Sequence, residues 1–195
     1  MIKLLFPLPR KLTVAISGGV DSVAVVDFLS NNHSVNCAFF HHGTESSDKA
    51  MNFVIDFCRD RNLLLHVGKI SNEKPKDKSL EEHWRHERYK FLHNLDSYVV
   101  TAHHLNDCVE TYIWSSLHGS PKTIARQKNN VYRPFLTTEK EEFVNWCVSR
   151  RIDWCEDTTN KDTRFTRNYI RQEMMPHVLR INPGINKVVK KMIES

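Results

Sequence analysis

The sequence predicts an α/β fold, with a doubly wound parallel sheet and a helical carboxyl-terminal extension. Short apolar runs alternate with segments of helical spacing over the first 118 residues. A turn with two glycines, residues 17–22, joins the first apolar run to the first helical segment. After residue 118 the alternation stops. A chain of 195 residues fits one domain with a small appendage, which we divide into a nucleotide-binding catalytic part, 1–135, and a basic helical extension packed on it, 136–195.

Each element of the alternation has its own local signal. Strands are expected where apolar residues run together between polar ones, at 12–16, 35–40, 63–67 and 98–101. Helices are expected between them, at 22–30, 48–61, 79–94 and 106–118. Further helices are expected in the last third, at 138–151, 167–179 and 183–193. Thr137 or Thr138 is the expected N-cap of the first of these. Loops are expected at 72–78 and 119–130, which are rich in polar and charged residues.

Charge and cysteine usage narrow the class of protein. The net charge is +5, and residues 117–195 carry the whole excess of basic residues. This favours a polyanionic partner such as a nucleic acid. No apolar run is long enough to cross a membrane and no signal-peptide pattern is present, so we expect a cytoplasmic protein without a membrane partner. The five cysteines form no C-x-x-C pair, which argues against a zinc or iron–sulfur site. The oligomeric state has no signal in the sequence.

The turn at 17–22 (SGGVDS) has the composition of a phosphate-binding loop. Its two glycines let the backbone approach an anion, and the following helix directs N–H groups and a positive dipole at it. Asp21 beside a phosphate indicates a bridging divalent cation, for which Mg²⁺ is the expected ion. Neither a Walker A lysine nor the dinucleotide G-x-G-x-x-G spacing is present. The candidate phosphate-binding residues are Ser17, Gly18, Gly19, Val20, Asp21 and Ser22, and the alternative is an ordinary tight turn.

A second candidate group lies where the fourth predicted strand meets its helix. Asp107 and Glu110 are three residues apart, so their carboxylates share one helical face near an N-terminus. They are suited to Mg²⁺ or to an ammonium group, and the alternative is a capping arrangement. His103 and His104 are adjacent, so at most one of them faces a cleft. Their spacing is not that of an H-E-x-x-H zinc site.

Two clusters of arginine complete the candidates. Arg85 and Arg88 share a helical face and lie next to Tyr89, a combination suited to phosphates and bases. The alternative is a solvated face with ion pairs such as Glu81–Arg85. Arg167 and Arg171 follow an acidic segment, 156–160. They are suited either to neutralising phosphates or to pairing with that segment.

Six motifs occur in the order typical of one family. They are SGGVDS (17–22), HHG (41–43), ExxxRxxRY (81–89), TAHHxxDxxET (101–111), RPF (133–135) and EDxxNxDxxxxRNxxR (156–171). Together they resemble the tRNA(Ile)-lysidine synthetase family of the PP-loop (ATP-pyrophosphatase) superfamily. The resemblance covers residues 12–178, and it implies an adenine nucleotide α-hydrolase-like fold.

The resemblance implies a ligase that forms a carbon–nitrogen bond. Members of the family modify the wobble cytidine (position 34) of tRNA(Ile) with a CAU anticodon. ATP adenylates O2 of the cytosine and pyrophosphate leaves; the ε-amine of free L-lysine then displaces AMP at C2, which gives lysidine. An unstacked base from a single-stranded loop suits this chemistry.

The resemblance also implies roles for individual residues. Residues 17–22 would hold the ATP phosphates, with Asp21 and Asp107 near Mg²⁺. Four residues would be catalytic, with Arg85 acting on the adenylated intermediate, His103 orienting phosphate or base, and Asp107 with Glu110 binding Mg²⁺ or the amines of lysine. Three arginines would contact phosphate or tRNA: Arg88, Arg167 and Arg171.

The chain departs from the family pattern in three places. The family commonly has an arginine shortly after HHG, where this chain has Thr44 and Glu45. The segment after Gly119 and Ser120 reads PKTIAR instead of a G-L-x-G pattern, which puts the substrate preference in question. Many members carry further carboxyl-terminal domains that grip tRNA, and the chain is expected to end just after the catalytic domain.

Other functions fit parts of the pattern. A sister enzyme that thiolates a tRNA cytidine would need paired cysteines, which are missing. A member that forms amides on small molecules fits poorly with the basic last third. A non-enzymatic module that binds ATP or tRNA is the alternative from another class. Retention of Asp21, Arg85, Asp107 and Glu110 together argues against it.

Overall fold

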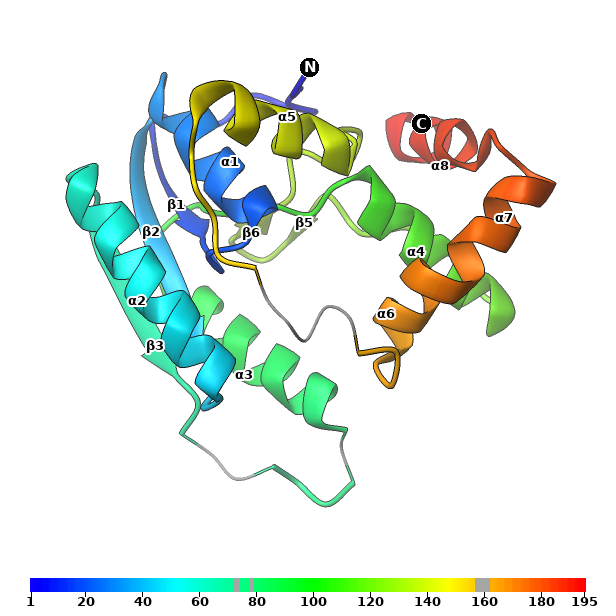
Figure 1. The fold of residues 1–195 in the computed structure, drawn as a ribbon, viewed down its shortest axis with the longest axis horizontal. Helices are drawn as coiled ribbons and strands as arrows, with labels where there is room; N and C mark the ends of the chain where they lie inside the picture. The colour runs from blue at the N-terminus through cyan, green and yellow to red at the C-terminus, as the bar shows by residue number, and fades with distance from the viewer. Residues whose placement is uncertain (72–73, 78, 157–161) are drawn as a thin grey trace.

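A computed structural model gives the fold of the chain and describes all residues except 72–73, 78 and 157–161 (Figure 1). The predicted alternation of strands and helices is confirmed over the first 117 residues. The four strands are β1 (Lys11–Ala15), β2 (Ser34–His41), β3 (Leu65–Lys69) and β4 (Val99–Thr101). The helices that follow them are α1 (Val20–Ser30), α2 (Glu45–Asp60), α3 (Leu80–His93) and α4 (Leu105–Leu117).

The strands form a six-stranded sheet in the order β3-β2-β1-β4-β6-β5. Among the described strands, pairing is parallel from β3 to β6, and β5 (Gln127–Lys128) pairs antiparallel with β6 (Val131–Tyr132). The α/β fold with a parallel sheet is therefore confirmed. The loop expected at 119–130 is wrong in its last part, which forms β5 and the turn into β6. Strands of two residues show no periodicity in the sequence.

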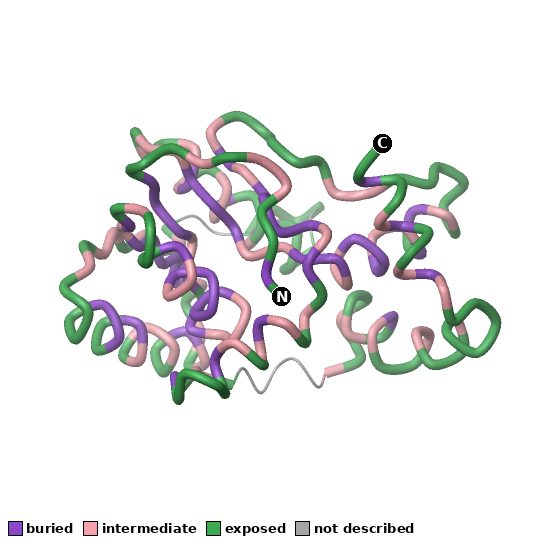
Figure 2. Tube along the Cα trace, turned by 90° about the horizontal axis from the view of Figure 1, so that it is seen from above, coloured by how far each residue is buried: buried purple, intermediate pink, exposed green. Residues whose placement is uncertain are grey.

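Alternate residues of the central strands pack on opposite layers, as the pleat requires. On one face Leu12 and Val14 of β1 pack in a core with α1, α2 and α5 (Lys140–Arg150). On the other face Ala38 of β2 and Val99 of β4 pack with Leu92 of α3. Figure 2 shows the buried residues running along the strands and the inward sides of the helices. The sheet is thus covered on both faces, which defines the doubly wound arrangement.

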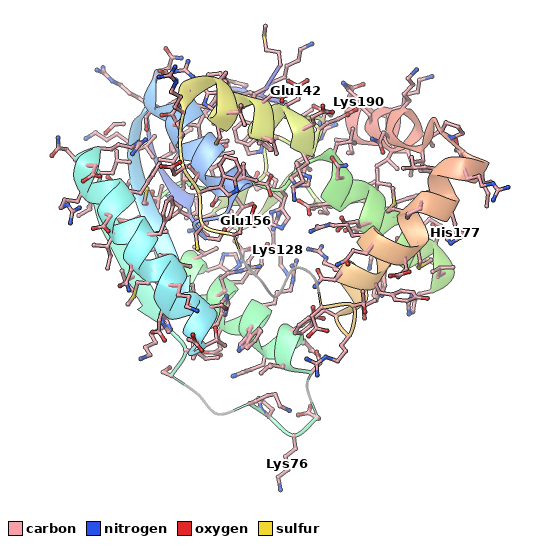
Figure 3. The ribbon with its side chains drawn as sticks, in the orientation of Figure 1. Lys76, Lys128, Glu142, Glu156, His177 and Lys190 are labelled. Carbon is pink, nitrogen blue, oxygen red and sulfur yellow. The ribbon has the colours of Figure 1, made fainter. Side chains whose placement is uncertain are left out.

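The carboxyl-terminal helices pack on α4 rather than on the sheet. They are α6 (Thr166–Tyr169), the π-helical turn η2 (Ile170–Met174), α7 (Met175–Ile181) and α8 (Ile185–Glu194). Ile170 and Val189 lie in one apolar cluster with Val109 of α4. In Figure 3, His177 and Lys190 mark α7 and α8 at one end of the molecule. Helix α5 packs in the main core, whereas the later helices pack on α4. The division of the chain at residue 135 stays a prediction.

Two local expectations in the last third are wrong. The single helix expected at 167–179 is broken into α6, η2 and α7, because Pro176 has no N–H for the helical ladder and its ring crowds the preceding turn. Thr138 does not cap α5, which begins after Glu139. Instead, the Thr138 hydroxyl accepts from the Lys3 N–H and donates to the Lys3 carbonyl, which ties the amino terminus to this loop.

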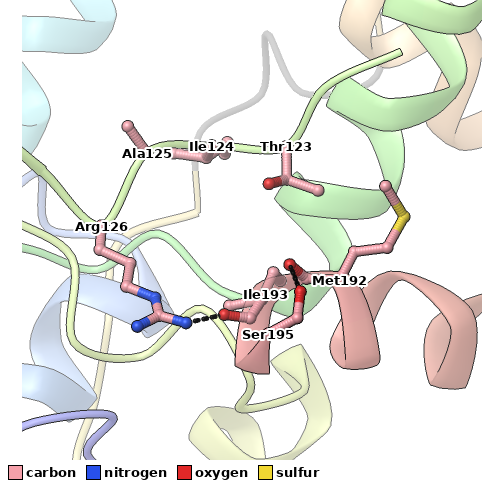
Figure 4. A pocket seen from close by; sticks show the side chains of 7 residues that line it. All are labelled: Thr123, Ile124, Ala125, Arg126, Met192, Ile193 and Ser195. Atoms are coloured by element: carbon pink, nitrogen blue, oxygen red, sulfur yellow. Dashed lines mark hydrogen bonds between the residues drawn. The ribbon is translucent and has the colours of Figure 1, made fainter.

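Within the described residues, none of the helices combines the length and apolar character needed to span a bilayer. A small cavity of about 440 Å³ lies between the end of α8 and residues 123–126 (Figure 4). The Arg126 guanidinium donates to the Ile193 carbonyl there. The altered segment after Ser120 therefore contributes to a separate cavity and not to the larger one described next.

Candidate functional site

A cavity of about 780 Å³ lies where β1, β2 and β4 end. Residues one or two positions after the ends of these strands line it, among them Ser17, His42 and His103. Neighbouring parallel strands bring their carboxyl ends to one edge of the sheet, where such folds bind ligands. The helices α3, α6 and η2 supply the opposite wall through Arg88, Arg167 and Arg171. Segments far apart in the sequence thus meet at one cavity.

Serine hydroxyls of the loop 17–22 form hydrogen bonds that fix its conformation. The Ser17 N–H donates to Ser22 Oγ (3.1 Å), and Ser22 Oγ donates to the Gly19 carbonyl (2.9 Å). Gly18 has a φ of 87°, which a residue with a side chain rarely adopts. No side chain caps α1 at Gly19. Ser17, Gly19, Asp21 and Ser22 line the cavity, so this helix N-terminus is available to an anion there.

Three groups link the loop to α4. Asp21 Oδ2 lies 3.6 Å from Nε2 of His104. On the other side of the ring, His104 Nδ1 accepts from the Asp107 N–H (3.3 Å), while Asp107 Oδ2 accepts from the His104 N–H (3.0 Å). This is a capping box, so the capping alternative for Asp107 is correct, and Asp107 lines the cavity as well. Sequence reasoning favoured His103 and missed this role of His104.

Burial and charge act against each other in this group. Burial lowers the pKa of His104, but Asp107 and Asp21 outweigh it and hold the pKa above the ordinary value. Burial raises the pKa of Asp107, but the His104 side chain and the His104 N–H that Asp107 accepts outweigh it, so the net shift is downward. The arrangement therefore favours an ionised Asp107.

Glu110 does not line the cavity with Asp107. Its side chain is buried, at 3% exposure, and accepts from Arg171 at both oxygens (2.7 and 3.1 Å). Arg171 Nη2 lies 3.8 Å from Asp107 Oδ1. Glu110 thus holds Arg171 at the cavity wall. The two acids were predicted to share one helical face, but of the two, Asp107 lines the cavity and Glu110 does not.

Arginines surround Tyr89 at the cavity wall. The guanidinium of Arg85 lies 4.9 Å from the centre of the Tyr89 ring and that of Arg88 lies 5.6 Å from it. Arg133 is buried and donates to the Tyr89 hydroxyl (2.9 Å) and to the Ala125 carbonyl (2.9 Å). Arg85 is exposed and is missing from the described residues that line the cavity. Sequence reasoning assigned no role to Arg133, although an arginine inside the apolar run VYRPF was a visible signal.

His103 lies among these cations. Its Nδ1 is 2.8 Å from Thr101 Oγ1. Burial, together with Arg133 and Arg88, lowers the pKa of His103 to about 3, although Asp107 acts in the opposite direction. The imidazole is therefore neutral near pH 7, suited to a hydrogen bond rather than to charge neutralisation.

Two carboxylates at the cavity fit a magnesium ion. Asp21 Oδ1 is buried and has no hydrogen-bond partner among the described residues, and Asp107 lines the same cavity. Carboxylate oxygens suit Mg²⁺, which is held in proteins by one or two carboxylates together with phosphates. In the described part of the chain no three histidine, cysteine or acidic residues are placed to hold a metal ion. Asp21 and Asp107 thus suit an ion that also binds a nucleotide.

Thr44 and Glu45, where the chain departs from the family pattern after HHG, lie at the cavity. Thr44 caps α2 by accepting from the Ser47 N–H (3.2 Å). Glu45 pairs with Lys49 at 2.8 Å, and both line the cavity. Glu156, labelled in Figure 3, begins the acidic segment 156–160 and lines the cavity, as does Lys140, which was not singled out from the sequence. Part of the acidic segment 156–160 lies outside the described residues.

Comparisons with known proteins agree with this architecture. The chain is 32% identical to a tRNA(Ile)-lysidine synthase from Thermosipho africanus over 95% of the chain and 48% of the relative. It is 28% identical to a protein of the same name from Haemophilus ducreyi, over 95% and 46%. The chain spans about half the length of these relatives.

A solved structure supports the fold alone. The NH3-dependent NAD synthetase from Campylobacter jejuni matches with a TM-score of 0.54 and 15% identity, over 95% of this chain and 84% of the other. A family model described as a PP-loop domain matches residues 4–178, which include the loop 17–22 and the facing residues of α3, α4 and η2. With the loop, the sheet order and the cavity in agreement, the chain belongs to the PP-loop domain family.

Proposed function

We propose that this chain uses ATP to attach lysine to C2 of the wobble cytidine (position 34) of tRNA(Ile) with a CAU anticodon. The intermediate is the adenylated cytidine, and the products are lysidine, AMP and pyrophosphate. The observation that carries the proposal is the meeting, at one cavity, of the anion-binding loop 17–22, the carboxylates Asp21 and Asp107, and a wall of arginines. Relatives that are tRNA(Ile)-lysidine synthases support the choice of reaction.

The loop side of the cavity suits ATP. Membership of the PP-loop family supports ATP as the nucleotide, and the unpaired start of α1 offers N–H groups to its phosphates. Asp21 and Asp107 would hold Mg²⁺, which supplies positive charge to the phosphate oxygens. In the first step O2 of the cytosine attacks the α-phosphorus, and the bond to pyrophosphate breaks. His103 is neutral and accordingly donates or accepts a hydrogen bond at the base or the phosphate.

The arginine wall suits the second substrate and the intermediate. Arg88, Arg167 and Arg171 line the cavity and can neutralise the phosphate of the adenylate or the tRNA backbone. Arg85 lies outside the cavity over Tyr89, where an exposed guanidinium is accessible to a bound polyanion. In the second step the ε-amine of L-lysine attacks C2, the C2–O bond breaks and AMP leaves. Glu110 is not free to bind the amines of lysine, because Arg171 pairs with both of its carboxylate oxygens.

Proximity and charge neutralisation carry this chemistry, since adenylation already converts a poor leaving oxygen into a good one. The substrates, free lysine and a tRNA, are those of a cytoplasmic enzyme.

Pyrophosphate release tests the first step. The chain is mixed with ATP, Mg²⁺ and an unmodified tRNA(Ile) transcript with a CAU anticodon, with and without lysine. We expect pyrophosphate release that requires the tRNA and that Asp21→Asn lowers by two orders of magnitude or more, roughly the loss expected from removing a group that stabilises charge in the transition state. A transcript with a GAU anticodon is the matched control. Release that is independent of tRNA, or equal with both transcripts, would contradict the proposal, and no release would favour a binding module.

A further inference from the structure

We propose that His104 is a positioning residue that holds the two cavity carboxylates, Asp21 and Asp107, at the spacing required to bind magnesium–ATP. The inference deepens the proposed function, because it concerns the nucleotide half of the same site. It does not depend on which group is ligated afterwards.

The geometry places one imidazole between the two acids. Nε2 faces Asp21 Oδ2 at 3.6 Å, and Nδ1 faces Asp107, whose N–H it accepts at 3.3 Å. Asp21 belongs to the loop after β1 and Asp107 to the helix after β4, and these strands are neighbours in the sheet. The ring of His104 is therefore a direct side-chain link between the two ligand-bearing segments.

His104 acts through the carboxylates and not on the substrate. Its side chain is 2% exposed and is not among the residues that line the cavity, whereas both of its partners are. The ring is packed against Phe143 of α5, with the ring centres 6.0 Å apart. The backbone behind it is held by the Leu105 N–H, which donates to the Thr138 carbonyl (2.8 Å). The imidazole thus has a fixed position from which to orient its partners.

Capping alone does not account for an imidazole here. Asparagine, aspartate, serine and threonine are the preferred N-caps, because a short oxygen-bearing side chain is sufficient to accept from the first turn. A short side chain at position 104 could cap α4 but would leave Asp21 Oδ2 without its neighbour. Asp21 Oδ1 has no hydrogen-bond partner among the described residues. Within this part of the chain, the contact between His104 Nε2 and Asp21 Oδ2 is therefore what orients the Asp21 carboxylate. Groups that orient metal ligands in this way commonly contribute 10–100-fold to metal affinity.

Two substitutions separate capping from positioning. His104→Asn keeps an acceptor in the place of Nδ1, so it retains the cap of α4 and loses the contact with Asp21. His104→Gln places a nitrogen near the position of Nε2, so it retains the contact with Asp21 and weakens the cap. Binding of ATP is measured by calorimetry over a range of Mg²⁺ concentrations, without tRNA or lysine, and thermal unfolding is measured in parallel.

We expect His104→Asn to raise the Mg²⁺ concentration needed for half-maximal ATP binding by about tenfold or more, with little change in thermal stability. We expect His104→Gln to have a lower melting temperature and a smaller increase in the Mg²⁺ requirement. The proposal is overturned if His104→Asn binds ATP at the wild-type Mg²⁺ concentration, or if the two variants differ in stability alone.

The test remains decisive if His104→Asn does not fold. His104→Gln then decides, with Asp21→Asn as the reference for loss of a carboxylate. A Mg²⁺ requirement between those of the wild type and Asp21→Asn supports the positioning role, and one equal to that of the wild type contradicts it. A wild-type chain that binds magnesium–ATP but ligates no lysine would refute the proposed function and leave the role of His104 intact.

Discussion

The two sides of the large cavity are held by different forces. On the loop side, Ser17, Gly19 and Ser22 are joined by hydrogen bonds between hydroxyls and backbone within six residues. On the helix side, Arg171 reaches Glu110 across 61 positions of the chain, and the contacts are between full charges. The loop is therefore held largely by bonds within itself, with one distant backbone bond from the Cys155 N–H to the Gly18 carbonyl (2.9 Å), whereas the charged wall exists only when distant helices have packed.

This difference predicts that a substitution on the helix side, hereafter the charged side, lowers the free energy of unfolding more than a substitution in the loop. The substitution on the charged side leaves a buried charge without its partner. The difference also predicts a pH dependence of stability from His103, which lies among the arginines of the charged side. Three experiments test this contrast.

The largest effect is expected for Arg171→Met. The substitution leaves the buried Glu110 carboxylate without its bidentate partner, which should lower the free energy of unfolding by about 3 kcal/mol after allowing for the partial exposure of Arg171. Glu110→Gln should cost less, since Arg171 can turn toward solvent. Urea unfolding measures both.

Arg164→Met is the matched control for that experiment. Arg164 also pairs with a carboxylate, that of Asp162, but at the exposed surface. Its removal should change the free energy of unfolding little. Equal losses for Arg164→Met and Arg171→Met would show that burial of Glu110 does not set the strength of the contact.

A smaller effect is expected for Ser22→Ala. The variant loses the bond to the Gly19 carbonyl and leaves the Ser17 N–H without the Ser22 acceptor, at a cost of about 1–2 kcal/mol. Ser116→Ala is the control, because the Ser116 hydroxyl only donates back to Tyr112 within α4. If Ser22→Ala destabilised the protein more than Arg171→Met, the contrast between the two sides would be reversed.

Per pH unit, the smallest effect is the pH dependence of stability that His103 contributes. Its pKa in the folded protein is about 3, against about 6.5 in the unfolded chain, so acidification below pH 6.5 protonates the unfolded state first. Stability should fall by about 1 kcal/mol for each pH unit between pH 6 and pH 4. His103→Asn removes this slope and keeps a polar partner for Thr101.

His104 does not produce the same signal, because its raised pKa has the opposite sign. Its contribution is present below pH 6.5 and is lost as the pH rises through the pKa of the folded state. For His103, the contradicting result is a free energy of unfolding that changes with pH equally in the wild type and in His103→Asn between pH 6 and pH 4. Such a result would show that His103 is not buried in the neutral form.

The sequence predicted the elements that have strong periodicity. The strands β1 to β4 and helices α1 to α4 lie close to their expected bounds, because apolar runs and helical spacing are local signals. The two-residue strands β5 and β6 have no such signal. The break at Pro176 did have one, since proline cannot continue a helical ladder, but the spacing of the arginines favoured a continuous helix.

Site residues were predictable where position in a strand–turn–helix unit determines them. The loop 17–22, His103 and Asp107 follow β1 and β4, and the structure brings them to one cavity. Contacts between distant segments had no local signal. Examples are the pairing of Glu110 with Arg171, the link from Arg133 to Tyr89, and the burial of His104 between two acids.

The most direct test of the proposed reaction is nucleoside mass spectrometry. An unmodified tRNA(Ile) transcript with a CAU anticodon is incubated with the chain, ATP, Mg²⁺ and lysine, and is then digested to nucleosides. The account predicts a mass gain on cytidine equal to lysine minus one water, which is absent without ATP and absent when lysine is omitted. Unmodified cytidine after incubation with an equimolar amount of folded protein that binds ATP would contradict it.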